Sequence, residues 1–195
     1  NISRPLRIGT GKTEDNPLFY FKGNLYDFRY YDRALSVTEI ARVARTETLG
    51  DEELHIKTFQ NDNYNLFSGS NVQLINNSVT FDSDIAIPVF DKKIAKFDGT
   101  NYLEIQYTPA LNTPQFTFSV WVYPTGTHSN WWRAVFSSRS VSPNSGYNLY
   151  IDNNNKWNFQ VGIGASGTDW VDVKSTNNAD LNVWTHVVVS YDGQN

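Results

Sequence analysis

The stretch around which this chain is organised reads Phe21-Lys-Gly-Asn-Leu-Tyr-Asp-Phe-Arg-Tyr-Tyr-Asp-Arg-Ala-Leu-Ser-Val-Thr-Glu-Ile40. Its first half alternates with the period of two that is typical of a half-buried β-strand. One side of this alternation consists of Tyr26, Phe28 and Tyr30, and the other of Asp27, Arg29 and Tyr31. The stretch therefore predicts a strand whose aromatic side packs into a hydrophobic core.

A short helix is predicted directly after this strand. Ser36 and Glu39 have the S-x-x-E spacing of a capping box, which satisfies two backbone N–H groups at a helix start. Leu35 and Ile40 stand at the two positions of a hydrophobic staple around that cap. The helical turn is expected to run from Val37 to about Arg45.

Two further motifs complete the pattern, Phe97-Asp-Gly-Thr-Asn-Tyr-Leu-Glu-Ile105 and Trp184-Thr-His-Val-Val-Val-Ser-Tyr-Asp-Gly193. Together with Phe21–Ile40 they resemble the laminin G-like domains of the concanavalin A-like lectin/glucanase superfamily. The resemblance implies an all-β fold, an antiparallel jelly-roll β-sandwich with one short helical turn. It also places the opening stretch at the closing strand and final turn of such a domain.

The motifs occur in permuted order, because the closing strand comes first. Residues 1–47 are expected to supply the closing strands and helical turn, and residues 48–195 the N-terminal and central strands. The strand that usually follows Tyr-Asp-Gly in the family is missing after Gly193. Three arrangements fit: a piece cut from tandem repeats, a circular permutant, or a unit whose first strands complete a neighbouring copy. The two parts are thus expected to complete one sandwich, within the chain or between copies.

Composition excludes several classes of protein. The net charge of −4 supplies no basic stripe for a nucleic-acid partner. No apolar run approaches the ~20 residues of a membrane span, so membrane insertion is not expected. Cysteine is absent, which excludes disulfides and cysteine metal sites.

Catalysis is not expected either. Glucanases of this superfamily carry a Glu-x-Asp-x-(x)-Glu strand that sets two carboxylates on one face, and no such strand occurs in this sequence. Glu104 stands alone in its strand, and the chain has only three histidines. We therefore predict that the protein is not an enzyme. A polysaccharide-active enzyme ranks third, after the two non-catalytic hypotheses given below.

Alternation predicts a ligand-binding sheet face instead. Outward positions of the strands 116–124, 147–151 and 157–163 carry aromatic and amide side chains without charges, a combination suited to sugars. The candidates are Trp121, Tyr123, Asn148, Tyr150, Asn158 and Gln160. The alternative is that these residues lie under loops or only solvate a sheet face, and Trp121 matches a family position usually explained by packing.

Two loops are a second candidate. Ser129-Asn-Trp-Trp-Arg133 contributes Trp131, Trp132 and Arg133, and Gly167-Thr-Asp-Trp170 contributes Trp170. Two adjacent tryptophans cannot both point inward from one strand, so one of the pair should be partly exposed. An exposed tryptophan indicates a ligand, a neighbouring subunit or a covering loop.

A Ca²⁺ site is implied by the resemblance alone. Asp98 and Asp27 match family positions that hold Ca²⁺, although Tyr26 replaces the family's usual acidic residue. Ca²⁺ needs six to eight oxygen ligands, and these two residues supply only part of that set.

The predicted function is a non-catalytic recognition or adhesion module that binds glycan or protein at a cell or virion surface, outside the cell. The alternative is a structural repeat of a surface fibre or assembly, whose exposed aromatics pack against neighbouring copies of itself. The fold alone does not separate these hypotheses, because it hosts lectins, enzymes, receptors and scaffolds alike.

Overall fold

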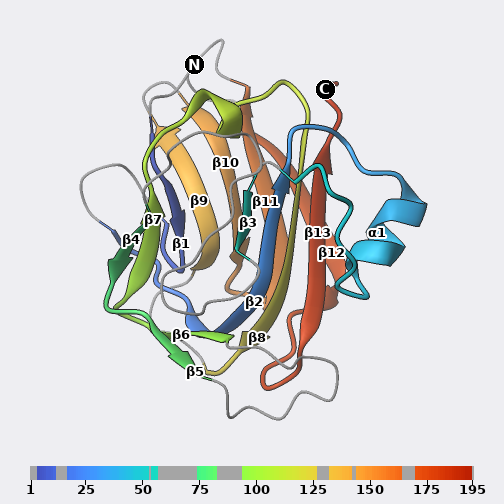
Figure 1. Cartoon of the computed structure of the whole chain (residues 1–195). Helices are drawn as coiled ribbons and strands as arrows, with labels where there is room; N and C mark the ends of the chain where they lie inside the picture. The colour runs from blue at the N-terminus through green and yellow to red at the C-terminus, as the bar shows by residue number, and fades with distance from the viewer. Residues whose placement is uncertain are drawn as a thin grey trace.

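The computed structural model describes residues 4–11, 17–52, 54–56, 74–82, 94–126, 132–141, 144–163 and 170–194. Two antiparallel β-sheets face each other as the layers of a sandwich (Figure 1). This confirms the predicted all-β fold, and one short α-helix, α1, accompanies the sheets in the described ranges.

The elements follow one another along the chain from β1 to β13. They are β1 (Leu6–Ile8), β2 (Lys22–Tyr31), α1 (Val37–Val43), β3 (Leu54–Ile56), β4 (Leu74–Asn77), β5 (Thr80–Asp82), β6 (Ile94–Asp98), β7 (Tyr102–Ile105), the 3-10 turn η1 (Pro109–Leu111), β8 (Phe116–Pro124), β9 (Arg133–Val141), β10 (Asn144–Ile151), β11 (Lys156–Ile163), β12 (Trp170–Asn178) and β13 (Thr185–Tyr191).

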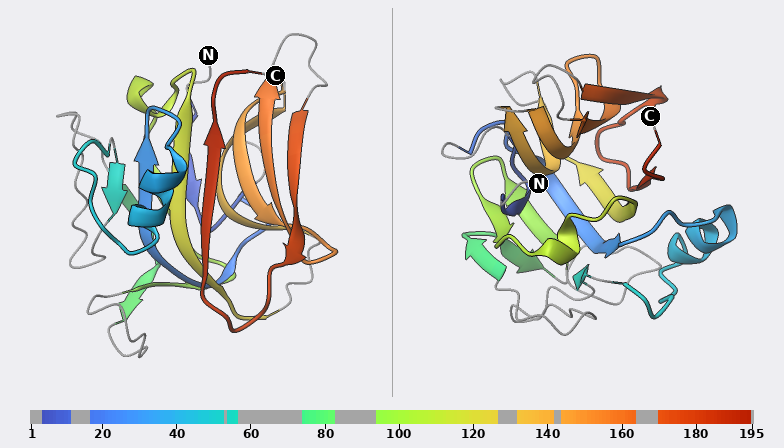
Figure 2. Two further views of the ribbon diagram at one scale, coloured as in Figure 1. Left: turned by 90° about the vertical axis from the view of Figure 1, so that its right-hand side faces the viewer. Right: turned by 90° about the horizontal axis from the view of Figure 1, so that it is seen from above.

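The first two strands lie inside the sheets rather than at their edges. The seven-stranded sheet has the order β12-β11-β10-β9-β1-β7-β4, so β1 joins β9 to β7. The six-stranded sheet has the order β13-β8-β2-β6-β5, and β3 also pairs with β2. Figure 2 shows the two layers, with α1 to one side of the six-stranded sheet. The division at residue 47 and the permuted or repeated origin of the chain stay predictions.

An aromatic cluster fills the space between the sheets. Phe28, Phe118 and Phe136 are fully buried, with ring centroids 5.7 Å apart for Phe28–Phe118 and 4.4 Å apart for Phe118–Phe136. Phe118 shares the inner face of β8 with Phe116, Val120 and Val122, as the alternation predicted. Burial of such rings contributes about 1.5–3 kcal/mol each.

The predicted alternation of β2 is interrupted by a β-bulge. Asp27 has a positive φ of 52°, and the pairing of β2 with β8 shifts its register between Tyr26 and Arg29. Phe28 and Tyr30 face the core as expected, but Leu25 takes the inner place before the bulge. Tyr26 lies opposite Trp121 on the outer face. The expectation that Tyr26 shares the core side was therefore wrong, because a bulge adds one residue to the period-two count.

The predicted capping box of α1 is present. The Ser36 hydroxyl accepts the Glu39 N–H at 3.3 Å, and the Glu39 carboxylate accepts the Ser36 N–H at 2.8 Å. Leu35 belongs to a small apolar cluster with Tyr31 and Val43, and Ile40 packs against it. The helix is thus held by its cap and by contacts with the end of β2.

A buried ion cluster fixes the segment after α1 to the outer face of β2. Arg29 is fully buried and donates to Asp27 at 2.6 Å and 3.0 Å. Its other nitrogen, Nη1, lies 3.4 Å from Glu52 and also donates to the carbonyl of Glu47. Glu52 in turn accepts the backbone N–H groups of Leu49 and Gly50. Three buried charges therefore hold residues 47–52 in place.

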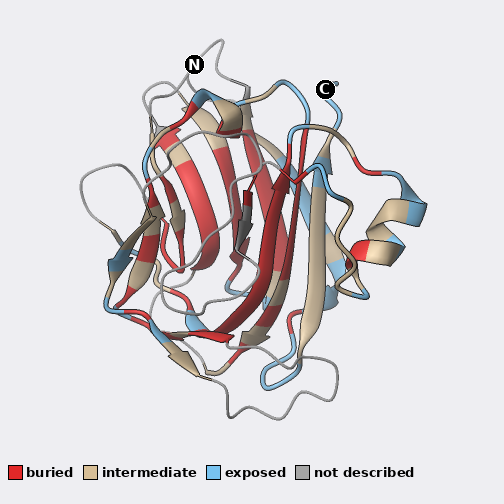
Figure 3. Cartoon of the chain, in the orientation of Figure 1, coloured by how far each residue is buried: buried red, intermediate tan, exposed pale blue. Residues whose placement is uncertain are grey.

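The sandwich is more exposed on one side, between β12 and β13. Figure 3 shows both strands as intermediate or exposed, whereas the strands at the centre are buried. Val173 is 63 % exposed although its register partner, Phe159, belongs to the core. In the part of the chain that the structure describes, β13 pairs only with β8. Such an edge can pair with a further strand.

The Arg29 cluster makes a prediction for stability. The Arg29→Met variant leaves Asp27 and Glu52 buried without their cation, which should lower the free energy of unfolding by about 3–5 kcal/mol. Urea denaturation followed by circular dichroism measures the change. Arg45→Ala is the matched control, since Arg45 forms an exposed pair with Glu47 and its loss should cost at most about 1 kcal/mol. Equal losses in the two variants would contradict the role of the cluster.

Candidate ligand-binding site

The single sheet face predicted from alternation is split between two sheets. Trp121 and Tyr123 lie on β8, in the six-stranded sheet, whereas Asn148 and Asn158 lie on β10 and β11, in the seven-stranded sheet. Both sets point away from the core between the sheets, and so they lie on opposite sides of the sandwich. The prediction of one shared face was wrong, because alternation tells inner from outer but not which sheet a strand joins.

Trp121 and Tyr123 are engaged in packing on the outer face of the six-stranded sheet. The Trp121 ring lies 5.1 Å from His186, and the Tyr123 ring lies 5.3 Å from Trp184. Ser119 Oγ hydrogen-bonds His186 Nε2 at 2.8 Å. Burial lowers the pKa of His186 to about 4. This side chain is therefore neutral at pH 7 and belongs to the packed face.

The outer face of the seven-stranded sheet carries one continuous row of side chains, one from each strand. Register pairs place them next to one another across the sheet. In strand order from β4 to β12 the row consists of Ile75, Glu104, Arg7, Ser137, Asn148, Gln160 and Asp172. The next row contains Tyr150, Asn158 and Lys174.

Among the described residues, four neighbouring side chains of these rows have buried polar atoms without a hydrogen-bond partner. We call them the amide face: Ser137, Asn148, Asn158 and Gln160. The atoms concerned are Ser137 Oγ, Asn148 Oδ1, both side-chain polar atoms of Asn158, and Gln160 Oε1. Asn158 is 0 % exposed and Gln160 6 %. A buried polar atom without a partner costs about 1–3 kcal/mol, so this cluster is an energetically unfavourable arrangement unless something binds it.

The segment that follows β1 passes over part of the amide face. Gly11 pairs with Leu18 through two backbone hydrogen bonds. A Cβ at Gly11 would lie 2.7 Å from the Cβ of Ala134, which is too close, and 3.8 Å from side-chain atoms of Ser137 and Asn148, an ordinary contact distance. Glycine at this position therefore allows the backbone to approach the sheet closely.

Aromatic rings border the amide face. Trp132 is partly exposed, and its ring stacks on Tyr150 with a centroid distance of 4.5 Å and an angle of 9°. Trp132 also contacts Phe19, with 5.9 Å between the two ring centroids. Burial raises the pKa of Tyr150, so its hydroxyl stays protonated. Trp131 lies outside the described residues.

Trp170 borders the same sheet face at its other end. The guanidinium carbon of Arg139 lies 4.9 Å from the centroid of the Trp170 ring. In register, Arg139 pairs with Gly146, Gly146 with Gly162, and Gly162 with Trp170. The two glycines between them carry no side chains, which lets the long arginine side chain reach the ring.

Arg133 does not join this face. It is 5 % exposed, and its Nη2 donates to Asn155 Oδ1 at 2.6 Å while Nη1 donates to the carbonyl of Gly126. Burial lowers the pKa of its guanidinium. Its contacts hold the turn between β10 and β11, and in the described structure they leave it a role in packing rather than in binding.

The face is also not free of charge, contrary to the expectation. Arg7 forms an ion pair with Glu104 at 2.8 Å, and Asp172 ends the row. Lys174 lies 3.9 Å from Asp152. These charged residues flank the amide face. The prediction missed them because it considered only the strands 116–124, 147–151 and 157–163, and not β1, β7 or β12.

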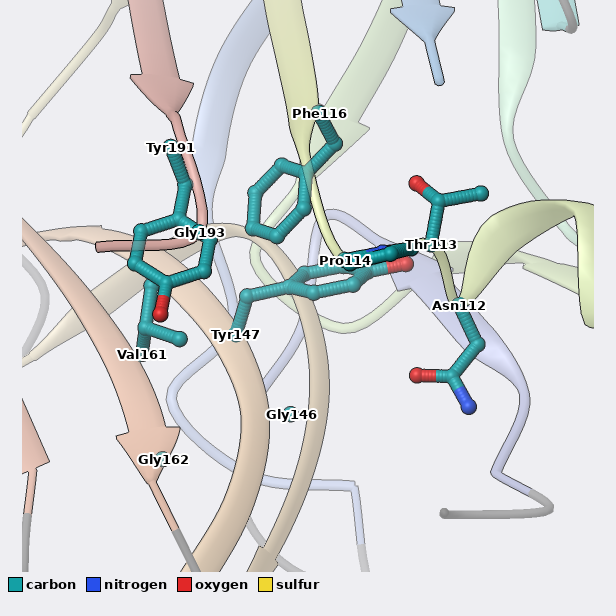
Figure 4. A pocket seen from close by; sticks show the side chains of 10 residues that line it. All are labelled: Asn112, Thr113, Pro114, Phe116, Gly146, Tyr147, Val161, Gly162, Tyr191 and Gly193. Atoms are coloured by element: carbon teal, nitrogen blue, oxygen red, sulfur yellow. The ribbon is translucent and has the colours of Figure 1, made fainter. Parts of the chain in front are cut away.

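A pocket of about 360 Å³ opens at the end of the sandwich (Figure 4). Aromatic rings of Phe116, Tyr147 and Tyr191 line it together with Gly146 and Gly162, the pair that separates Arg139 from Trp170 on the outer face. No carboxyl or imidazole group is found among its described lining residues.

The two residues matched to a Ca²⁺ site do not meet. Asp98 pairs with Lys22, five residues from Asp27 along β2, a separation of about 16 Å. Asp27 is bound by Arg29, and Asp98 Oδ1 accepts hydrogen bonds from Thr100. Within the described ranges, no three acidic or histidine side chains are placed to hold a metal ion. Asp98 and Asp27 therefore do not fit a shared Ca²⁺ ion, and whether the chain binds Ca²⁺ stays a prediction.

Sequence reasoning missed Ser137, Arg7 and Arg139. The hydrophobic part of β9 ends at Phe136, but the strand continues to Val141. Its second half reads Ser-Ser-Arg-Ser and has no hydrophobic alternation to reveal it. Pairing with β10 and β1 keeps it in the sheet.

Comparison with known families agrees with this architecture. The two antiparallel sheets define the class of jelly-roll β-sandwiches. Residues 97–195, just over half of the chain, match a laminin G-like family model described as the concanavalin A-like lectin/glucanases superfamily. The chain therefore belongs to this superfamily. Searches of curated proteins and of solved structures returned no match. Among the described residues, no helix is long and apolar enough to cross a membrane.

His186 predicts a pH dependence of stability. Its pKa is about 4 in the folded protein, against 6.5 for an unperturbed histidine, so the unfolded chain binds more protons between these values. The free energy of unfolding is therefore unaffected by this difference above pH 6.5. It falls as the pH drops from 6.5 toward 4, by on the order of 2 kcal/mol. Urea denaturation at pH 7, 6 and 5 should show a shallower loss in His186→Gln than in the wild type. Parallel losses would exclude this role of His186.

Proposed function

We propose that this chain is a non-catalytic glycan-recognition module that binds its ligand at the amide face. The observation that supports the proposal is the group of buried, unpartnered polar atoms on Ser137, Asn148, Asn158 and Gln160 in the described structure. Buried polar groups in proteins are almost always hydrogen-bonded. A cluster of exceptions on one surface is a candidate for a site that is completed by a ligand.

The chemistry of this surface suits a sugar. Amide oxygens accept hydrogen bonds and amide nitrogens donate them, and sugar hydroxyls do both. The partly exposed Trp132, stacked on Tyr150, offers an apolar ring beside the polar groups. Aromatic rings of this kind combine contact area with a defined geometry.

The carboxylates of the long row are poorly placed for hydrolysis. Glycosidases need two carboxyl groups about 5–10 Å apart. Asp172 on β12 and Glu104 on β7 are separated by five strand spacings, or about 24 Å. Glu104 is also paired with Arg7. Asp172 and Glu104 therefore do not form a glycosidase pair.

The proposal places the module outside the cell, on a cell or virion surface, where glycans are displayed. Adhesion is the corresponding biological role. The competing hypothesis is a structural repeat whose partly exposed aromatics contact neighbouring copies. It predicts self-association and no glycan binding, which analytical ultracentrifugation and a glycan array distinguish.

Substitutions at the amide face test the proposal. Trp132→Ala should weaken glycan binding about three- to tenfold through loss of the ring contact, and Asn158→Leu should weaken it by a similar factor through lost hydrogen bonds. Affinity electrophoresis against the glycan that binds the wild type on an array measures both. Tyr123→Leu, on the opposite side of the sandwich, is the matched control and should bind like the wild type. Equal weakening in all three variants, or no binding by the wild type, would contradict the proposal.

A further inference from the structure

The six-stranded sheet is one strand short of the sheet that faces it, on the side where β12 and β13 lie (Figure 2). Rings of β8 meet a ring of β10, with centroids 4.9 Å apart for Phe118–Tyr147 and 5.2 Å for Phe116–Tyr147. Beyond this contact one sheet continues with β13 alone, and the other with β11 and β12. Among the described residues, β12 therefore has no strand opposite it. This explains why Val173, on the inner side of β12, is 63 % exposed.

Two pockets follow one another along this empty strand position. The first, of about 260 Å³, lies between inner positions of β11, β12 and β13. The second is the pocket of about 360 Å³ in Figure 4, lined by Val161 and Tyr191, the next inward residues of β11 and β13. Apolar pockets in such a row accommodate every second side chain of an extended strand. The apolar lining of the first pocket includes Trp157, Phe159, Val173, Val187 and Val189.

The free edge of β13 has none of the usual protection against a further strand. In the described part of the chain β13 pairs only with β8, so the backbone groups of its other edge have no strand partner there. Natural proteins protect such edges with charged residues or proline. Neither occurs in Thr185–Tyr191, whereas β12 carries Asp172 and Lys174. In composition β13 therefore resembles a strand from the inside of a sheet.

A second copy of the chain does not fit this position through its own β13. In an antiparallel β13–β13 pair related by a two-fold axis, both seven-stranded sheets would lie on the same side of the joined sheet. Each β12 extends one strand position past its own β13, so it would occupy the space of β11 in the other copy. The position therefore admits a single strand that brings no second sheet with it.

From the empty strand position, its pockets and its unprotected edge we infer that this side of the sandwich binds an extended segment of a partner protein. The segment adds one strand to the six-stranded sheet, and its backbone hydrogen-bonds the free edge of β13. Its apolar side chains, at every second position, enter the pockets under β12, and the polar side chains between them point outward. This peptide site goes beyond the proposed glycan binding, because the amide face lies on the outer side of the seven-stranded sheet.

Fluorescence anisotropy with the labelled peptide KTVTVTVTK tests the inference on the wild-type chain. Its valines alternate with threonines, and the control peptide KTTVVVTTK has the same composition without the alternation. The alternating peptide should bind at least about tenfold more tightly, because only this order places all its valines on one side of a strand. Hydrogen exchange followed by mass spectrometry should show slower exchange of the β13 amides with the peptide bound, and unchanged exchange in the edge strand β5.

Val173→Lys places a cation on the inner side of β12, over the empty strand position, and should weaken binding of the alternating peptide at least about tenfold. Since Val173 is exposed, the variant should keep the circular dichroism spectrum of the wild type. Val37→Lys is the matched control, because Val37 lies on α1 and is 84 % exposed.

Three results would overturn the inference: no peptide binding by the wild type, equal binding of the two peptides, or equal binding by Val173→Lys and Val37→Lys. Analytical ultracentrifugation adds a fourth. Self-association of the wild type that Val173→Lys abolishes would show that copies of the chain, and not a partner's segment, occupy the position.

Discussion

The β-bulge at Asp27, in the middle of β2, governs how the six-stranded sheet is built. By adding one residue to the strand, it directs Leu25 and Phe28 inward on either side of the irregularity and turns Tyr26 outward. It also brings the Asp27 carboxylate onto the guanidinium of Arg29. A non-glycine residue with positive φ is strained, and the buried ion pair holds the backbone in this conformation.

The consequences extend from the bulge to the rest of the six-stranded sheet. Arg29 reaches Glu52 and the backbone of Glu47, which fixes the segment that leads from α1 to β3. Next to it, His186 is packed between Ser119 and Trp121. On the outer face of this sheet, Trp121 and Tyr123 are packed against His186 and Trp184, and their part in ligand binding stays a prediction.

The seven-stranded sheet has a different outer face. Its row of side chains draws one residue from every strand, and the residues in the centre of the row are polar, buried and, in the described structure, partly without partners. Such an arrangement lowers stability, because each unsatisfied group has lost its hydration. Proteins tolerate local costs of this kind mainly at functional sites. The contrast between a packed outer face and an unsatisfied one is what favours recognition on one side of the sandwich.

The class of fold, the capped helix and the inner faces of several strands could be predicted from the order of residues alone. Those features depend on local spacing: Ser36 and Glu39 are three residues apart, and Phe116 to Val122 alternate with period two. Tertiary contacts determine which strands share a sheet, and therefore that Trp121 and Tyr123 lie across the sandwich from Asn148 and Asn158. They also produce the bulge, the burial of Arg133 in hairpin contacts, and the separation of Asp27 from Asp98. Strand partners, bulges and ion pairs depend on contacts between residues far apart in the chain, and the period of a single strand carries no information about them.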